Sequence, residues 1–115
     1  MSATRTEAVT RHRNGVAVID LSGNIDASAE SELTRAYNEA TETETTTVVL
    51  NFANVGYINS TGIALIVGLM AGARKDGLPI AACGLSEHYK EIFEITRLAD
   101  FMPVFPDEEA AVGAA

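Results

Sequence analysis

The alternation of apolar and polar residues along the chain predicts about five strands and about four helices. The strongest pattern lies over Val48–Phe52, where three consecutive apolar residues, two of them β-branched, predict a strand covered on both faces. A connection over Ala53–Asn59 leads to the mostly apolar stretch Ile63–Ala73, which predicts a helix that ends at the charges and glycine of Arg74–Gly77. Such a helix is either buried or offers a face to a partner. Its apolar run has about half of the ~20 residues that a membrane span requires.

The other elements follow from shorter apolar runs and from their turn residues. Asn14-Gly15 is a hairpin signal between the first two strands. Asp26 or Ser28 is expected to cap the first helix, and Ser86 the third. The predicted strands are Thr4–Thr10, Val16–Leu21, Leu78–Cys83 and Phe101–Phe105; the predicted helices are Ala27–Glu42, a stretch from Ser86 to Thr96, and Asp107–Val112; residues 22–26 are expected to form a loop.

A hairpin followed by alternating helices and strands predicts an α/β fold with a mixed, mostly parallel sheet. At this length we expect a single domain over residues 1–115. If the strands lie in sequential order, right-handed crossovers place their helices on one face of the sheet and leave the other face less covered. Gly68 and Gly72 are expected to let the apolar helix pack closely against a neighbouring element.

Composition narrows the range of partners. The chain is 47% apolar, as expected of a globular protein, and carries a formal net charge of −8. Binding to nucleic acid or to an anionic membrane depends on clustered Lys and Arg, so we expect neither partner. Cys83 stands alone in an apolar run and is expected to be a small core residue in a reducing compartment. The first fifteen residues lack the apolar core of a secretory signal, so we expect a cytoplasmic protein.

Ser60 stands where the connection enters the apolar helix, and two roles remain open for it. Its hydroxyl, or that of Thr61, can act as the N-cap by accepting a hydrogen bond from a first-turn amide. The same helix end tolerates an anion, so a phosphate on Ser60 would add about −1.5 to −2 charges without unfolding the helix. Capping and function are likewise both open for Asp26, as are core burial and partner contact for Leu65 and Leu69.

The sequence carries no pattern typical of an enzyme. The segment INSTG, residues 58–62, stands at a strand-to-helix turn like the elbow of a serine hydrolase, but it lacks the glycine two residues before the serine. The only histidine downstream is His88. Neither a Cys/His metal spacing nor a glycine-rich phosphate loop is present. We therefore expect no catalytic residue, no metal and no cofactor.

Three segments of the chain stand in an order that is specific in another way. They are Val48–Leu69 with its Ser-Thr-Gly junction, Gly23–Asp26 after the second strand, and Tyr89–Leu98 followed by Phe-Pro and an acidic helix. Together they closely resemble the STAS domain of bacterial anti-sigma-factor antagonists. The resemblance covers nearly the whole chain, and the Ser-Thr-Gly junction with its apolar helix is its most specific part.

The resemblance implies a small bacterial switch protein whose unmodified form binds an anti-sigma factor and so frees a sigma factor for transcription. In this family the anti-sigma factor is usually also a serine kinase, which phosphorylates the antagonist at the start of the second helix, and a PP2C-type phosphatase resets it. Ser60 matches the phosphorylated serine, with Thr61 as the second choice, and Asp26 matches an acidic position near it. The expected partner surface consists of Asn24, Asp26, Asn59, Ser60, Thr61, Gly62 and Leu65.

One residue departs from the family pattern. Switch members usually have Asp immediately before the serine, whereas this chain has Asn59, which keeps a cap-competent oxygen and loses a charge. Some STAS domains are not phosphorylated and serve as scaffolds or transporter-associated modules. The alternative function is therefore an unphosphorylated scaffold or adaptor in a sensory or transport complex.

Overall fold

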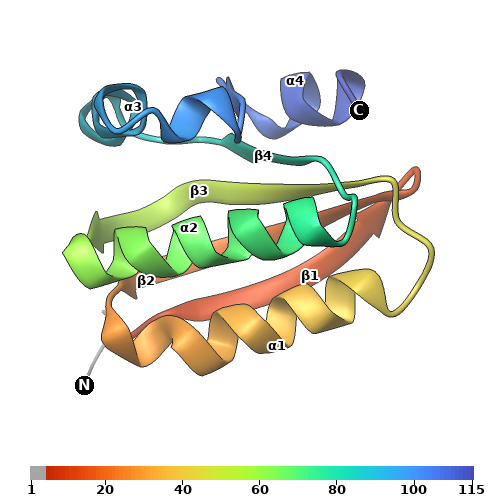
Figure 1. Ribbon diagram of the computed structural model, residues 1–115, viewed down its shortest axis with the longest axis horizontal. Coiled ribbons are helices and arrows are strands. Elements are labelled where there is room, and N and C mark those ends of the chain that lie inside the picture. Colours follow the sequence, from red (N-terminus) through yellow and green to blue (C-terminus); the bar gives the residue numbers. More distant parts are fainter. Residues whose placement is uncertain (1–4) are drawn as a thin grey trace.

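The chain folds into a five-stranded mixed sheet with helices on both faces (Figure 1). The computed structural model describes residues 5–115, so Thr4, the predicted start of the first strand, lies outside the described residues. In chain order the elements are β1 (Glu7–Arg13), β2 (Val16–Ile25), the 3₁₀ turn η1 (Ala27–Ala29), α1 (Glu30–Thr41), β3 (Thr47–Ile58), α2 (Ser60–Lys75), β4 (Ile80–Cys83), α3 (Glu87–Ile95), the 3₁₀ turn η2 (Leu98–Asp100), β5 (Val104–Phe105) and α4 (Glu108–Gly113).

The strands lie in sequential order across the sheet, from β1 to β5. The β1–β2 pair is antiparallel, and the β2–β3, β3–β4 and β4–β5 pairs are parallel. Asn14 and Gly15 both have positive φ, as a tight hairpin between twisted strands requires. The predicted mixed, mostly parallel α/β sheet is therefore confirmed.

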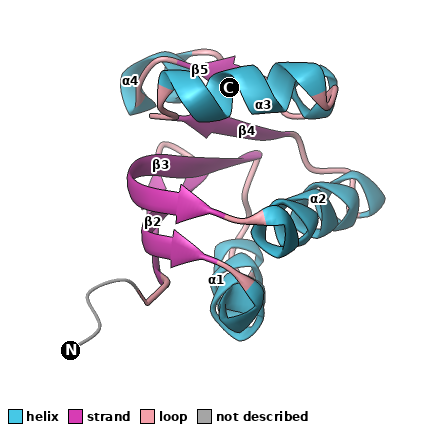
Figure 2. Cartoon of the chain, turned by 90° about the vertical axis from the view of Figure 1, so that its left-hand side faces the viewer, coloured by secondary structure: helices cyan, strands magenta, loops and turns pink. Residues whose placement is uncertain are grey.

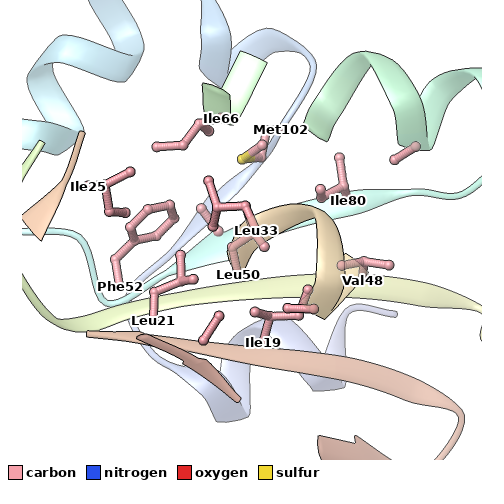
Figure 3. Packing of buried hydrophobic residues seen from close by; sticks show 14 of the residues in the cluster. Ile19, Leu21, Ile25, Leu33, Val48, Leu50, Phe52, Ile66, Ile80 and Met102 are labelled. Carbon is pink, nitrogen blue, oxygen red and sulfur yellow. The ribbon is translucent and has the colours of Figure 1, made fainter. Parts of the chain in front are cut away.

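The two faces of the sheet are covered unequally. Side chains from α1, α2 and α3 pack on one face and form the main core with alternate strand residues such as Ile19 and Leu50 (Figure 3). On the other face, Ala111 of α4 covers a smaller cluster that includes Val49 and Cys83. The strand over Val48–Phe52 is thus covered on both faces, as predicted. Cys83 is fully buried, and this burial raises the pKa of its thiol to about 11.

β2 and β3 extend beyond their predicted ends, and this is the main correction to the expected fold. All but the last residue of the predicted loop over residues 22–26, and most of the connection over Ala53–Asn59, continue the parallel ladder, with Ser22 opposite Asn54 and Ile25 opposite Ile58. Register irregularities follow Asp20 and Gly23. The polar residues and glycines of these segments conceal strands because the backbone, not an apolar alternation, maintains the pairing.

Smaller corrections concern element ends and the helix glycines. β1 runs up to the hairpin turn rather than ending at Thr10, because the ladder continues to the pair of Arg13 and Val16. β5 is shortened because the amides of Phe101 and Met102 bond back to the carbonyl of Leu98 in η2. The expectation that Gly68 and Gly72 pack against a neighbouring element is wrong. A Cβ at either glycine would meet no atom of another element within 4 Å.

Within residues 5–115, no helix is both long and apolar enough to cross a membrane. The helix that bears on function is α2, which lies beside α1 in front of the sheet (Figure 1).

Candidate functional site

The candidate site is the junction where β2 and β3 end and the chain turns into helices. Ile25 and Ile58 are register partners at the ends of the two strands, and the amide of Asn59 donates a hydrogen bond of 3.2 Å to the carbonyl of Ile25. Asp26 and Asn59 therefore follow side by side, since neighbouring strands lie about 4.8 Å apart. Figure 2 shows the two arrows leading through short loops into α1 and α2.

Asn59, not Ser60 or Thr61, is the N-cap of α2, so of the two roles considered for Ser60 the capping one is wrong. The backbone of Asn59 is extended, and its Oδ1 accepts a hydrogen bond of 2.8 Å from the amide of Gly62. Its carbonyl accepts the first helical bond from Ile63 at 2.9 Å. Ser60 is thus the first helical residue. Its side chain is exposed, and within residues 5–115 its hydroxyl has no hydrogen-bond partner.

Gly62 lets the first turn of α2 rest directly on the end of β2. A Cβ at this position would lie 2.1 Å from the carbonyl oxygen of Ile25, a backbone atom that cannot rotate away. Gly62 is buried, unlike Gly68 in the same helix. The Ser-Thr-Gly order therefore joins an exposed hydroxyl to a glycine that fixes the position of the helix.

Two side-chain hydroxyls hold the strand ends in place. The hydroxyl of Thr6 donates a hydrogen bond to the carbonyl of Asn24, next to the last residue of β2. The hydroxyl of Tyr89, from α3, accepts a hydrogen bond of 2.8 Å from the amide of Ile58 at the end of β3. Neither hydrogen bond is evident from the sequence, although Tyr89 is expected to face inward from its helix. The sequence feature that could have indicated the Tyr89 bond is a tyrosine on a buried helix face, since a buried phenol hydroxyl usually has a hydrogen-bond partner.

The electrostatic environment of the junction combines a carboxylate with a helix N-terminus. Asp26 accepts hydrogen bonds from the hydroxyl of Ser28 at 2.6 Å and from its amide at 2.9 Å, and these bonds lower the pKa of Asp26. Its carboxylate is therefore ionised at neutral pH, and Asp26 caps η1 as predicted. The first turn of α2 carries no acidic residue. The partial positive charge of this helix end is thus not neutralised by its own side chains.

The structure brings six of the seven expected partner-surface residues to this junction, namely Asn24, Asp26, Asn59, Ser60, Thr61 and Gly62. Leu65 lies further along α2, is half-buried and packs against the main core. Leu69 packs in the same way. The role of these residues in binding a partner remains a prediction.

Neither histidine is hydrogen-bonded to Ser60. The ring of His12 lies 3.0 Å from the hydroxyl of Thr43, and the ring of His88 packs edge-on against Tyr89 with centroids 4.8 Å apart. Among residues 5–115, no group of three His, Cys, Asp or Glu side chains is arranged to hold a metal ion. Chemically, the junction offers an exposed hydroxyl on a helix end that accommodates an anion.

Comparison with known proteins identifies the family to which this fold and junction belong. The model of the STAS domain family matches residues 7–111 of the chain. This chain belongs to the STAS domain family. An anti-sigma-B factor antagonist of Staphylococcus epidermidis is 31% identical to this STAS domain over 86 residues, which are 75% of the chain and 80% of the relative.

Solved structures agree with this fold. A crystal structure of an anti-sigma factor antagonist from Mycobacterium paratuberculosis has a TM-score of 0.80 and 18% identity, and the match covers 99% of this STAS domain and 97% of that chain. The phosphorylated form of the Bacillus cell fate determinant SpoIIAA has a TM-score of 0.70 and 21% identity, and the match covers 94% and 99% of the two chains. At these identities the likeness establishes the shared fold alone.

Proposed function

We propose that this STAS domain is an anti-sigma-factor antagonist switched by phosphate on Ser60. Its unphosphorylated form binds an anti-sigma factor that is also a serine kinase, and a sigma factor is thereby released. Phosphorylation weakens the complex, and a PP2C-type phosphatase restores it. The domain acts by binding rather than by catalysis, in the cytoplasm. The observation that carries the proposal is the exposed hydroxyl of Ser60, which is left free because Asn59 caps α2.

The geometry of the helix end explains why a phosphate there would not disturb the fold. Oδ1 of Asn59 already bonds the amide of Gly62, and the amides of Ser60 and Thr61 remain at the open end of the helix. A phosphate adds about −1.5 to −2 charges at a position where the helix dipole favours them. The switch therefore requires no rearrangement inside the domain.

The partner, in contrast, would meet a new dianion beside the ionised Asp26. Burying that charge in an interface costs desolvation, and acidic groups of the partner are repelled. A loss of ~3 kcal/mol in binding free energy corresponds to a complex weakened roughly a hundredfold. Asn59 is structurally compatible with this switch, because it caps the helix as Asp would and changes only the charge that a kinase would meet.

Phosphopeptide mapping of the protein from its own cells, growing and stressed, tests the proposal first. The informative peptide spans Asn59–Arg74. We expect phosphate on Ser60, with an occupancy that changes with condition. Phosphate on Thr61 would keep the switch and move its site by one residue. Absence of phosphate in every condition would contradict the switch and favour the scaffold or adaptor function.

Binding measurements with the anti-sigma partner provide the second test. Ser60→Asp is expected to weaken the complex, whereas Ser60→Ala is expected to bind as the unmodified protein does, because the hydroxyl has no structural bond to lose. Asn38→Asp adds a charge at an exposed position of α1 outside the junction; it is the matched control and should leave the affinity unchanged. Equal affinity of Ser60→Asp and Ser60→Ala would contradict the proposal.

A further inference from the structure

We propose that Tyr89 is a positioning residue for the switch: its hydroxyl holds the end of β3 and thereby the capped turn that presents Ser60. This inference rests on the proposed function of Ser60. Tyr89 lies in α3 and hydrogen-bonds Ile58, so it would act on Ser60 through the backbone rather than by contact. This role arises because β4 is too short to pair with the end of β3.

β4 is shorter than β3, so part of the edge of β3 has no neighbouring strand. The last β3–β4 register pair is Asn51 with Cys83, whereas β3 continues to Ile58. The amide of Asn59 points toward β2, because it bonds the carbonyl of Ile25. Amides alternate in direction along a strand, so the amide of Ile58 points to the side that β4 does not reach.

Burial makes this unpaired edge costly. Ile58 is only 5% exposed, so water does not readily reach its amide. A buried amide without a partner costs about 1–3 kcal/mol. Tyr89 supplies the partner in place of a strand: its oxygen accepts from the amide of Ile58 at 2.8 Å, and its hydroxyl lies 3.4 Å from the carbonyl of the same residue.

The position of this hydroxyl is set by α3. Tyr89 is 8% exposed, and its amide donates to the hydroxyl of Ser86, the cap of α3. The ring is therefore fixed by burial and by the first turn of its own helix. From Tyr89 the chain of contacts runs to Ile58, then to the adjacent Asn59, whose side chain holds the amide of Gly62. Loss of the first contact is expected to loosen the last.

Amide hydrogen exchange of the purified protein and its Tyr89→Phe variant tests the inference. We expect the amides of Ile58 and Gly62 to exchange about tenfold faster or more in the variant, beyond any change at the core amide of Leu50. Tyr37→Phe is the matched control. It removes a tyrosine hydroxyl that bonds Asp76 at 2.8 Å at the other end of α2, and it should leave Ile58 and Gly62 unchanged.

Two results would overturn the inference. Equal acceleration at Ile58, Gly62 and Leu50 would mean that Tyr89 only stabilises the whole domain. Acceleration at Ile58 alone would mean that the contact does not reach the turn of Ser60. Should the variant fail to fold, the native protein still decides: the amide of Ile58 must be protected like that of Leu50, and exchange at the rate of an open amide would refute the bond.

The outcome separates this inference from the proposed function. A missing phosphate on Ser60 in cells would remove the switch and leave the exchange pattern of Tyr89→Phe as it is. A uniform exchange pattern would remove the role of Tyr89 and leave the phosphate mapping untouched.

Discussion

The extended backbone of Asn59 explains why Ser60 has a free hydroxyl. Ser, Thr and Asn are all effective N-caps, and all three stand together at residues 59–61. The sequence could therefore predict the junction and its candidate serine, but not which residue caps the helix. That choice depends on where β3 ends, and the end of β3 is held in place by hydrogen bonds to Ile25 and Tyr89. Long-range contacts of this kind leave no local pattern.

A comparison of stabilities tests this assignment of the cap. Asn59→Ala is expected to lower the free energy of unfolding by about 1 kcal/mol, because the amide of Gly62 loses its acceptor. Asn59→Asp keeps the acceptor, and Ser60→Ala removes no hydrogen bond, so both should remain within about 0.5 kcal/mol of the native protein. Urea denaturation measures all three. A larger loss in the free energy of unfolding for Ser60→Ala than for Asn59→Ala would mean that Ser60, not Asn59, caps the helix.

The two kinds of glycine in α2 allow a second comparison. Gly62→Ala is expected to destabilise the domain by about 3 kcal/mol, since its Cβ would meet the carbonyl of Ile25 at 2.1 Å. The Cβ of Gly68→Ala would meet no atom of another element within 4 Å, so this change should stabilise the helix by up to about 1 kcal/mol. Thermal unfolding of the two variants measures the difference. Equal effects would refute the close contact at Gly62.

At the scale of elements, the helices follow their sequence signals more closely than the strands do. η1 and α1 together span the predicted first helix to within a residue, Asp26 and Ser86 are caps that the sequence indicated, and Asp107 caps the last helix rather than beginning it. β2 and β3 extend beyond their apolar segments because their backbones stay paired through the segments that contain Gly23 and Asn54. Strand pairing joins segments that are distant in sequence, so the pattern of one polar segment alone does not predict it. These hidden extensions are the part of the fold that builds the site.

α4 depends on ion pairs for its attachment. It has six residues, too few for a stable isolated helix. Glu108 bonds Arg11 at 2.8 Å and Arg13 at 2.9 Å, and Glu109 bonds Arg13 at 2.7 Å. Hydrogen bonds from Arg11 are the main reason why the pKa of Glu108 is lowered. The helix covers Cys83, whose thiol can therefore report its opening.

Labelling of Cys83 with a thiol reagent tests this attachment. Glu108→Gln is expected to raise the labelling rate roughly two- to fivefold, because one or two exposed ion pairs contribute on the order of 1 kcal/mol to holding α4 closed. High salt should act in the same direction on the native protein. Glu32→Gln breaks a comparable exposed pair with Arg35 on α1 and serves as the control. Equal rates for both variants would contradict the role of Glu108.

The whole molecule has a strong excess of acidic groups, yet its carboxylates are not equivalent. The formal net charge is −8. Asp20 lies on the α4 side of the sheet, where Arg11 binds both its oxygens and Asn51 donates to one of them. These contacts, led by the hydrogen bond from Arg11, lower the pKa of Asp20 against the opposing effect of burial. Its ionised form therefore stabilises the fold.

The pH dependence of stability follows from the sign of that shift. A carboxyl whose pKa is lower in the folded state contributes stability above its unfolded pKa, about 3.9, and loses it as the pH falls through the folded value. We expect the urea concentration at the midpoint of unfolding of the native protein to decrease when the pH is lowered below about 4. Asp20→Asn should be less stable at neutral pH and should lose less on acidification. Parallel curves for the two proteins would contradict the contribution of Asp20, since the other carboxyls are common to both.

The separation of the cap from the free hydroxyl also has an evolutionary consequence. Folding depends on the side chain at residue 59, whereas the proposed signal depends on the side chain at residue 60. A lineage can therefore replace the serine by a residue that carries no signal, or by one with a permanent charge, and still inherit an intact domain. A change at residue 60 alone can then convert a phosphorylated switch into a domain that always binds its partner or into a scaffold that carries no signal. Each of these proteins still folds, so selection can act on the change.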